Sequence, residues 1–425
     1  MAFCSATPKP SKEGTMNQKE LWKRVVGRTV LVAVSISMIA TLGVSGSLAA
    51  EKVIEFGCAV SMSGMFSHEG ELHRDGLEFW KDAVNEQGGI NVGGVNHEVE
   101  IIYADDKSDT ATSAKLVEKL ITVDKVDFLF GPFGSGATFA SSSVAEKYKV
   151  LMIAPMGSSD KIYQRGYKYL FSACSTVAKS HEEWVSGLLS ELNPPPKTLA
   201  IIAQNSLWPL SESAAFKKPA EAWGLEIVYE EKYPPGTEDF SPLYTEIRKV
   251  KPDILYAITF VKEMIIMAKQ LREMQVYAPM VIMPAGPSVP DFRESLGDSA
   301  EYIIGNTSWA ATLPYKGKLF GSAGDYARRF KEKFGYVPDR TEASATVSGL
   351  IYQLAIERAG SLDTEKVREA VKALDDTTFY GPLRFDDEGV NVGTPSTILQ
   401  MQGGKHLAVY PPAHAQAKLI YPMPK

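Results

Sequence analysis

The sequence predicts an α/β protein with two lobes, each built on a parallel central sheet that helices cover on both faces. Short apolar runs alternate with longer amphipathic stretches over most of the chain. The runs are apolar throughout and rich in β-branched residues, which is typical of strands buried on both faces of a sheet. The chain has 425 residues, which exceeds one ordinary domain and fits two.

Strands and helices are expected to alternate up to about residue 283. The strand-like runs lie at 53–60, 99–104, 126–130, 150–154, 169–174, 198–203, 226–229, 254–259 and 280–283. The helical stretches lie at 69–86, 110–123, 136–148, 178–191, 210–223, 240–250 and 262–274. Units of one strand and one helix in this order form parallel sheets.

The order changes after Tyr302. Three helical patterns follow one another at 323–334, 342–359 and 363–374, and short strand-like runs come next at 381–386, 396–402 and 407–410. This order predicts that the chain returns to the first lobe and then crosses again. We therefore expect a signal peptide with an upstream extension at 1–50, lobe 1 at 51–173 plus 306–378, and lobe 2 at 174–305 plus 379–425.

The first fifty residues have the pattern of a secretory signal peptide. Lys19, Lys23, Arg24 and Arg28 precede an apolar run at 30–42, and small residues follow up to Ala50. A membrane anchor is the alternative, but the run is shorter than the ~20 residues that a membrane span needs. The pattern predicts export to the periplasm.

The charge of the chain argues against nucleic-acid binding. The whole sequence has a net charge of −6, and residues 1–50 carry six Lys/Arg against two Asp/Glu, so the remainder is more acidic still. Nucleic-acid binding needs a basic face. After residue 50 only Cys58 and Cys174 remain, each in a strand-like run. Two buried thiols and one disulfide are both open, and the cysteines have no metal-type spacing.

Loops at the carboxyl ends of the predicted strands are the candidate binding site, because ligands of open parallel sheets bind there. In lobe 1, the loop after residue 130 runs into a helix through Ser135 and Gly136. Ser135 is a candidate helix N-cap. Free backbone N–H groups and the helix dipole would favour an anion there, and a plain strand–helix turn with a serine cap is the alternative.

Two further loops of lobe 1 belong to the same candidate site. Met156, Gly157 and Ser158 follow the strand at 150–154, and Ser158 would cap a helix or bond a ligand. Phe66 and His68 follow the first strand and would line a cleft. Simple capped turns are the alternative for both loops.

Lobe 2 offers mainly apolar side chains at the matching positions. Trp208 follows the strand at 198–203 and is either an aromatic wall or a core residue. Phe260 follows the strand at 254–259, and Ala285 follows the strand at 280–283. Lobe 2 is thus expected to cover the apolar part of a ligand.

Motifs for catalysis are weak. The chain has no G-x-S-x-G elbow, no P-loop and no H-E-x-x-H pair. The acidic run Asp105-Asp106-Lys107-Ser108-Asp109 lacks calcium-loop spacing. We therefore predict a binding protein and not an enzyme, with no cofactor and no metal.

The chain resembles type I periplasmic binding proteins of the leucine/isoleucine/valine-binding kind, which feed ABC transporters. The resemblance covers nearly all of the chain after residue 50 and depends on the order and spacing of individually loose motifs. These motifs include Ser63-Gly64, Gly131-Pro132-Phe133-Gly134-Ser135, Ala154-Pro155, Tyr233-Pro234-Pro235-Gly236, Lys251-Pro252-Asp253 and Tyr380-Gly381-Pro382.

The resemblance implies two Rossmann-like lobes joined by a three-strand hinge that close over a ligand. It implies that Ser135 and the loop from Met156 to Ser158 hold a carboxylate, and that Trp208 and Phe260 are second-lobe aromatic contacts. Amino-acid binders of this family often have an acid for the ammonium where this chain has Ala285. Either Glu69 or Glu263 replaces it, or the ligand lacks an ammonium group.

The resemblance further implies a monomer that binds a small carboxylate-bearing solute, such as an apolar or aromatic amino acid, and delivers it to the permease subunits of an ABC importer. An ammonium-free aromatic or aliphatic acid ranks nearly level with the amino acid. A ligand sensor for a signalling partner and an enzyme built on the same lobes are the rival functions.

Overall fold

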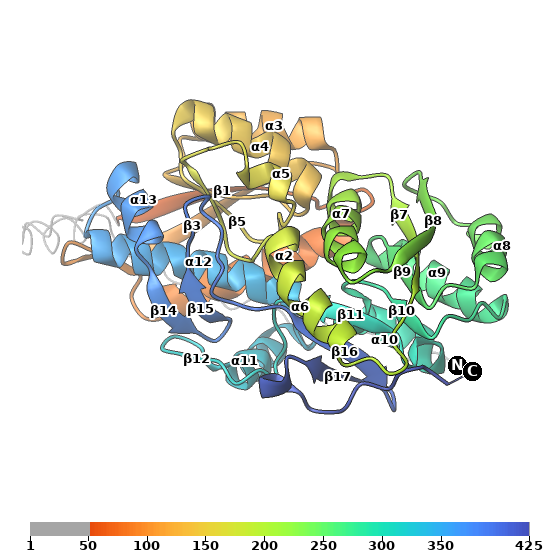
Figure 1. The fold of residues 1–425 in the computed structure, drawn as a ribbon. Coiled ribbons are helices and arrows are strands. Elements are labelled where there is room, and N and C mark those ends of the chain that lie inside the picture. The colour runs from red at the N-terminus through yellow and green to blue at the C-terminus, as the bar shows by residue number, and fades with distance from the viewer. Residues whose placement is uncertain (1–51, 425) are drawn as a thin grey trace, which may run out of the picture. The chain divides into compact units, whose positions relative to one another are not determined.

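The computed structural model describes residues 52–424 and contains two central sheets (Figure 1). The expected signal peptide at 1–50 lies outside these residues. The first sheet has the strand order β2-β3-β1-β4-β5-β6. All its pairs are parallel except the β2–β3 hairpin. Its strands are β1 (Val53–Val60), β2 (Ile90–Val92), β3 (Val95–Asp105), β4 (Phe128–Phe130), β5 (Met152–Ala154) and β6 (Leu170–Ser172).

Helices cover both faces of the first sheet, as the continuously apolar strands predict. Along β1, Phe56 and Cys58 face one apolar cluster, while Ala59 faces the other. In Figure 1, the helices α3, α4 and α5 lie above this sheet, and the long helix α12 lies below it. The bounds are α2 (Ser67–Asn85), α3 (Thr110–Lys119), α4 (Ser135–Tyr148), α5 (Asp160–Tyr163) and α12 (Arg340–Ala359).

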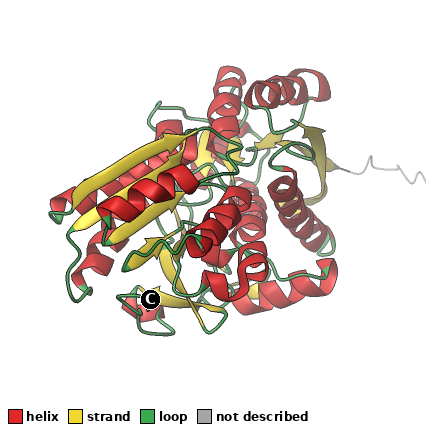
Figure 2. Cartoon of the chain, turned by 90° about the vertical axis from the view of Figure 1, so that its right-hand side faces the viewer, coloured by secondary structure: helices red, strands yellow, loops and turns green. Residues whose placement is uncertain are grey.

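The second sheet has seven strands in the order β17-β16-β11-β10-β9-β7-β8. Strands β7 to β11 pair in parallel, whereas β16 and β17 are antiparallel additions at one edge. Figure 2 shows these strands between helices. The strands are β7 (Thr198–Gln204), β8 (Glu226–Tyr233), β9 (Ile254–Ile258), β10 (Met280–Ile282), β11 (Ile304–Thr307), β16 (Thr397–Gln402) and β17 (Lys405–Tyr410). The helices are α6 (Val177–Ser190), α7 (Leu207–Ala222), α8 (Ser241–Val250), α9 (Val261–Glu273) and α10 (Pro290–Leu296).

The late helices return to the first lobe, as the sequence predicts. Tyr352 of α12 packs its ring against Phe56 and Phe130 of the first sheet. Its hydroxyl donates to the carbonyl oxygens of Leu129 and Leu151, at 2.7 and 2.8 Å. The remaining elements are β12 (Lys316–Gly317), β13 (Gly321–Ser322), α11 (Ala323–Phe334), α13 (Thr364–Lys372), β14 (Asp375–Thr378) and β15 (Gly381–Arg384).

The chain passes between the lobes three times: after β6, after β11 and after β15. The first and third crossings lie side by side, because the Ser172 N–H donates to the Gly389 carbonyl at 2.8 Å. The side chain of Asn391 also donates from Nδ2 to the carbonyl of Ala173, at 3.1 Å. These bonds hold the crossings together as a hinge.

One expected boundary between the lobes is too early. We expected lobe 2 to resume at residue 379, but β15 pairs with β14, and Leu383 is buried in the first-lobe core. The crossing therefore follows β15. The other bounds of the two lobes remain a prediction. None of the helices within residues 52–424 combines the length and apolarity that a membrane crossing needs.

Candidate functional site

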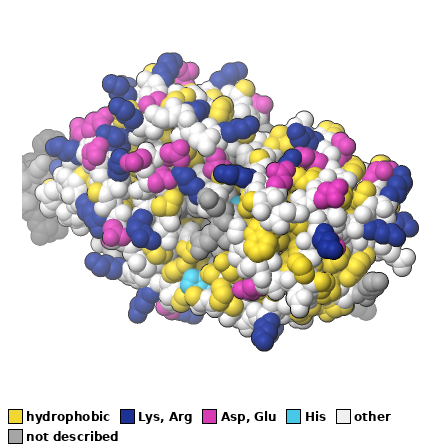
Figure 3. Space-filling view, viewed as in Figure 1, with side chains coloured by type: hydrophobic (Ala, Val, Ile, Leu, Met, Phe, Trp, Pro, Cys, Tyr) yellow, Lys and Arg dark blue, Asp and Glu magenta, His cyan; other side chains and the backbone are white. Residues whose placement is uncertain are grey.

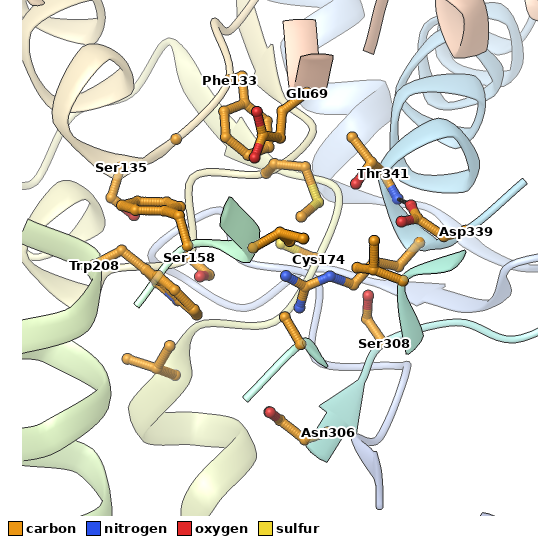
Figure 4. Close-up of a pocket in the computed structure, with 18 of the residues that line it drawn as sticks. Glu69, Phe133, Ser135, Ser158, Cys174, Trp208, Asn306, Ser308, Asp339 and Thr341 are labelled. Carbon is orange, nitrogen blue, oxygen red and sulfur yellow. Dashed lines mark hydrogen bonds between the residues drawn. The ribbon is translucent and has the colours of Figure 1, made fainter. Parts of the chain in front are cut away.

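A cavity between the two lobes collects side chains from the carboxyl ends of strands in both sheets (Figure 4). The centre of a water molecule can occupy about 90 Å³ of this cavity. This volume is room for one compact solute or several waters. Lobe 1 contributes His68, Glu69, Leu72, Phe133, Gly134, Ser135, Met156, Ser158, Asp339, Arg340 and Thr341. Lobe 2 contributes Val177, Ser180, Trp208, Glu212, Thr259, Phe260, Val261, Ala285, Val289, Asn306 and Ser396, and the crossings contribute Cys174, Ser175, Ser308 and Thr394.

Ser135 lines this cavity, but it does not cap its helix. The N-cap position of α4 is taken by Gly134, whose φ of 82° suits glycine, and Ser135 is the first helical residue. The Ser135 hydroxyl oxygen accepts from the N–H of Ser159 at 3.2 Å. That bond ties two strand-end loops together, so Ser135 both supports the wall and presents a hydroxyl to the cavity.

The neighbouring predicted residues divide into two groups. Met156 and Ser158 line the cavity, whereas Gly136 and Gly157 are absent from its wall. A Cβ on Gly157 would lie 2.8 Å from the side chain of Thr138, so glycine permits this close approach. Ser158 is not a cap, because Ser159 is the N-cap of α5.

Four aromatic rings connect the two lobes in a row. Phe133 and Phe66 of lobe 1 have ring centroids 5.7 Å apart, and Phe66 lies 4.8 Å from Phe260 of lobe 2. Phe260 in turn lies 5.2 Å from Trp208. Phe66 itself is not part of the cavity wall, but it packs against Phe133 and Phe260, which are. Trp208 is 8% exposed and belongs to none of the core clusters of residues 52–424, which favours the aromatic-wall interpretation.

Ala285 lines the cavity in a strained backbone conformation. Its φ is 70°, which is uncommon for a residue other than glycine. Its methyl group adds no charge to the wall. Glu69 and Glu263, the two acids that would supply the missing negative charge, lie at different positions relative to the cavity.

Glu69 is the acid that reaches the cavity, and Glu263 does not. The Glu263 carboxylate accepts from Gln204 Nε2 at 2.9 Å, from Thr259 Oγ1 at 2.7 Å and from the Gly236 N–H at 2.7 Å. Glu69, in contrast, forms no ion pair with any of the described side chains. Burial is the largest influence on Glu69 and raises its pKa above the ordinary value.

His68 lies where the two lobes meet. Its Nε2 is 2.9 Å from Asp291 Oδ2 of α10, and both side chains are about half exposed. The hydroxyls of Ser159 and Ser211 are 2.6 Å apart across the same gap, and the Ala178 N–H donates to Asp160 at 3.1 Å. The described conformation is therefore one in which the lobes touch.

The site contains residues that the sequence analysis did not select. The most important is Arg340, which begins α12 beside Asp339. The helix was expected from residue 342 onward, which left both residues out of the site. A capping box joins Asp339 to Glu342, and this local signal places the start of the helix. Figure 4 shows Asp339 and Thr341 across the cavity from Trp208.

A serine, a histidine and a glutamate form a chain at the lobe 2 side. Ser180 Oγ lies 3.2 Å from His181 Nδ1, and His181 Nε2 lies 2.7 Å from Glu212. Tyr256 donates to the same Glu212 oxygen at 2.9 Å. The Ser180 hydroxyl also donates to the carbonyl of Val177 at 3.0 Å, which directs its proton away from the imidazole. This arrangement suits a buried structural network.

Cys58 and Cys174 are both buried free thiols. Burial raises the pKa of each, so neither is prepared as a thiolate. Within residues 52–424, no three His, Cys, Asp or Glu side chains gather as a metal site. The face in Figure 3 carries acidic and basic side chains intermixed.

Solved structures show the same two-lobe architecture. The isoleucine complex of LivJ, a branched-chain amino acid transporter substrate-binding protein from Streptococcus pneumoniae, has a TM-score of 0.74 at 24% identity. It covers 87% of this chain and 100% of that one. The benzoate complex of a solute-binding protein from R. palustris has a TM-score of 0.74 at 19% identity, covering 84% and 95%. The fold is thus that of the substrate-binding proteins of ABC transporters.

Sequence comparison agrees with the fold. The "Leu/Ile/Val-binding protein homolog 8" of Brucella abortus (strain 2308) is 26% identical over 411 residues, covering 90% of this chain and 97% of the relative. The family model for periplasmic binding proteins matches residues 53–405. The chain therefore belongs to the periplasmic binding protein family, as the resemblance indicated.

Proposed function

We propose that this protein binds a small carboxylate-bearing solute between its lobes and delivers it to the permease of an ABC importer. The observation that carries the proposal is the cavity itself, because both lobes supply its walls. A ligand that touches both walls stabilises the closed form over the open one. Such a protein works by binding and release, without a chemical step.

The leading ligand class is an amino acid with an apolar, branched or aromatic side chain. The rings of Trp208 and Phe260 suit an apolar side chain, and Glu69 is an acid of the wall that an ammonium group could pair with. The alternative class is an aromatic or aliphatic acid without the ammonium. The uncharged Ala285 supports the alternative, and so does the raised pKa of Glu69, because a neutral carboxyl needs no counter-ion.

Export and delivery belong to the same proposal. The basic and apolar pattern of residues 1–50 fits a cleaved signal peptide and a periplasmic location. In the periplasm, a monomeric closed form would dock on the permease subunits.

A thermal-shift screen tests this function. Isoleucine and 3-methylpentanoate differ only in the ammonium group, as do phenylalanine and 3-phenylpropionate. Benzoate extends the panel to a short aromatic acid. A ligand at 100 times its Kd adds about 2.7 kcal/mol of stability, which raises the melting temperature measurably.

The pattern of shifts decides the ligand class. Shifts with the amino acids alone support an ammonium site, and Glu69→Gln should then abolish that preference. Shifts with the deaminated acids support the alternative class. If no acid shifts the melting temperature, or if a bound acid is chemically converted on prolonged incubation, the proposed function is wrong.

A further inference from the structure

One basic side chain of the cavity wall has no counter-charge. Arg340 is the only Lys or Arg among the described residues that line the cavity. It forms no ion pair with any side chain that the structure describes, and its buried Nε has no hydrogen-bond partner among them. A guanidinium carries five N–H donors and no acceptor, so its requirement can be met only by an acceptor from elsewhere.

The nearby carboxylates do not meet this requirement. Asp339 Oδ1 accepts from the Thr341 N–H at 2.5 Å as the cap of α12. Asp339 Oδ2 is buried without a hydrogen-bond partner among the described residues, so it does not bond the guanidinium either. Glu212 is bound by His181 and Tyr256. The protein thus leaves Arg340 unpaired although acids line the same cavity.

The position of Arg340 on its helix adds to this imbalance. It is the first residue of α12, where the helix dipole presents its positive end. A cation in the first turn is unfavourable there, whereas an anion is stabilised. The Arg340 charge also acts on Cys174 in the first crossing, where it favours a lower pKa of the thiol. Burial has the larger and opposite effect on that pKa.

We propose that Arg340 is the specificity-determining residue of the site and binds the solute's carboxylate through its planar guanidinium. This inference rests on the proposed function and changes its expected anchor from Ser135 to Arg340. A carboxylate matches the guanidinium with two parallel N–H···O bonds. The carboxylate would lie by the start of α12, and the rest of the solute would extend toward Trp208 across the cavity.

The test combines a protein change with a ligand change. The ligand pair is the panel acid with the largest thermal shift and its primary amide, which has the same shape without the charge. The protein pair is Arg340→Met and Arg248→Met. Arg248 is exposed on α8 and is not part of the cavity wall. Its replacement therefore removes the same charge at a position away from the solute.

Calorimetric titration should give a clear pattern. Wild type and Arg248→Met should bind the acid at least about 100-fold more tightly than the amide. Arg340→Met should lose roughly that factor for the acid and bind acid and amide alike. Arg340→Lys keeps the positive charge but loses the planar pair of N–H donors, so it should retain part of the preference for the acid over the amide. This variant replaces Arg340→Met in the test if the methionine variant does not fold.

The unliganded proteins provide an independent readout. If Arg340 serves binding, Arg340→Met should melt at the same temperature as wild type or higher, because an unmatched charge has been removed. A fall in melting temperature with acid binding within threefold of wild type would overturn the inference. Failure of wild type to bind any acid would instead overturn the proposed function, so the two failures are distinguishable.

Discussion

The two walls of the cavity differ in how their polar groups are satisfied. On the lobe 2 wall, Glu212 is bound by His181 and Tyr256, and Thr259 donates to Glu263 at 2.7 Å. On the lobe 1 wall, neither Arg340 nor Glu69 forms an ion pair with a side chain that the structure describes. Under the proposed function, the unmet polar groups of lobe 1 would select a head group, and the rings of lobe 2 would select the shape of the rest of the solute.

The largest expected effect concerns the stability of lobe 1 in acid. His73 of α2 is fully buried, both its ring nitrogens lack partners among the described residues, and burial lowers its pKa to about 4. The contribution of neutral His73 to the free energy of unfolding is complete above the ordinary pKa of 6.5. It is lost as the pH falls toward 4, because the imidazole takes up a proton in the unfolded chain at a higher pH than in the folded protein. The loss is roughly 3 kcal/mol.

Chemical unfolding between pH 6.5 and pH 4 measures this loss. His73→Met should flatten the dependence whatever its absolute stability, because the titrating group is gone. Hydrogen exchange at pH 5 should show protection falling in α2 before α9. Equal slopes for variant and wild type would show that His73 does not set the acid sensitivity of lobe 1.

Trp208→Ala breaks the apolar wall. Loss of about 2 kcal/mol of buried aromatic contact corresponds to roughly 30-fold weaker binding of the panel acid with the largest thermal shift. Trp223→Ala is the control, because that ring is 48% exposed at the far end of α7. Wild-type affinity in the Trp208 variant, measured by calorimetry, would assign this ring to packing alone.

Ser135→Ala tests a smaller contribution from lobe 1. A neutral hydroxyl is worth about 1 kcal/mol in a hydrogen bond, so binding should weaken about fivefold without unfolding the protein. Ser143→Ala, on the exposed side of the same helix, should leave the affinity unchanged. If the two variants have equal affinity for the same acid, Ser135 only ties its loop to Ser159.

Asp291→Asn should have the smallest effect. It removes the charge opposite His68 at the junction of the lobes, and a half-exposed pair contributes at most about 1 kcal/mol. We expect ligand release to accelerate no more than about fivefold in stopped-flow measurements. A change beyond tenfold would mean that this contact controls opening.

Much of this architecture is predictable from periodicity. The run at 53–60 is a strand with those same bounds, and the expected helix at 136–148 begins one residue earlier. Strands of three or four residues were harder, because a run such as Ile304–Thr307 offers too few positions to show a pattern. That strand leads to Asn306 and Ser308 in the cavity wall.

The candidate site was partly predictable for the same reason. The strand-end rule selected Ser135, Met156, Ser158, Trp208, Phe260, Ala285 and His68, which line one cavity, while their role in binding remains a prediction. It also selected Gly136, Gly157 and Phe66, which are not part of the wall. It missed Arg340, because α12 follows no strand of the first sheet and reaches the cavity only through tertiary packing.

The paired crossings make some parts of the cavity wall insensitive to motion. Cys174 and Thr394 lie in the wall close to the backbone that Asn391 joins. In any rotation of one lobe about that pivot, atoms near the axis move least, and atoms farther from it move more. A solute bound near the pivot would therefore keep the same contacts in the open and the closed form. Only contacts far from the pivot would form or break as the lobes close and open.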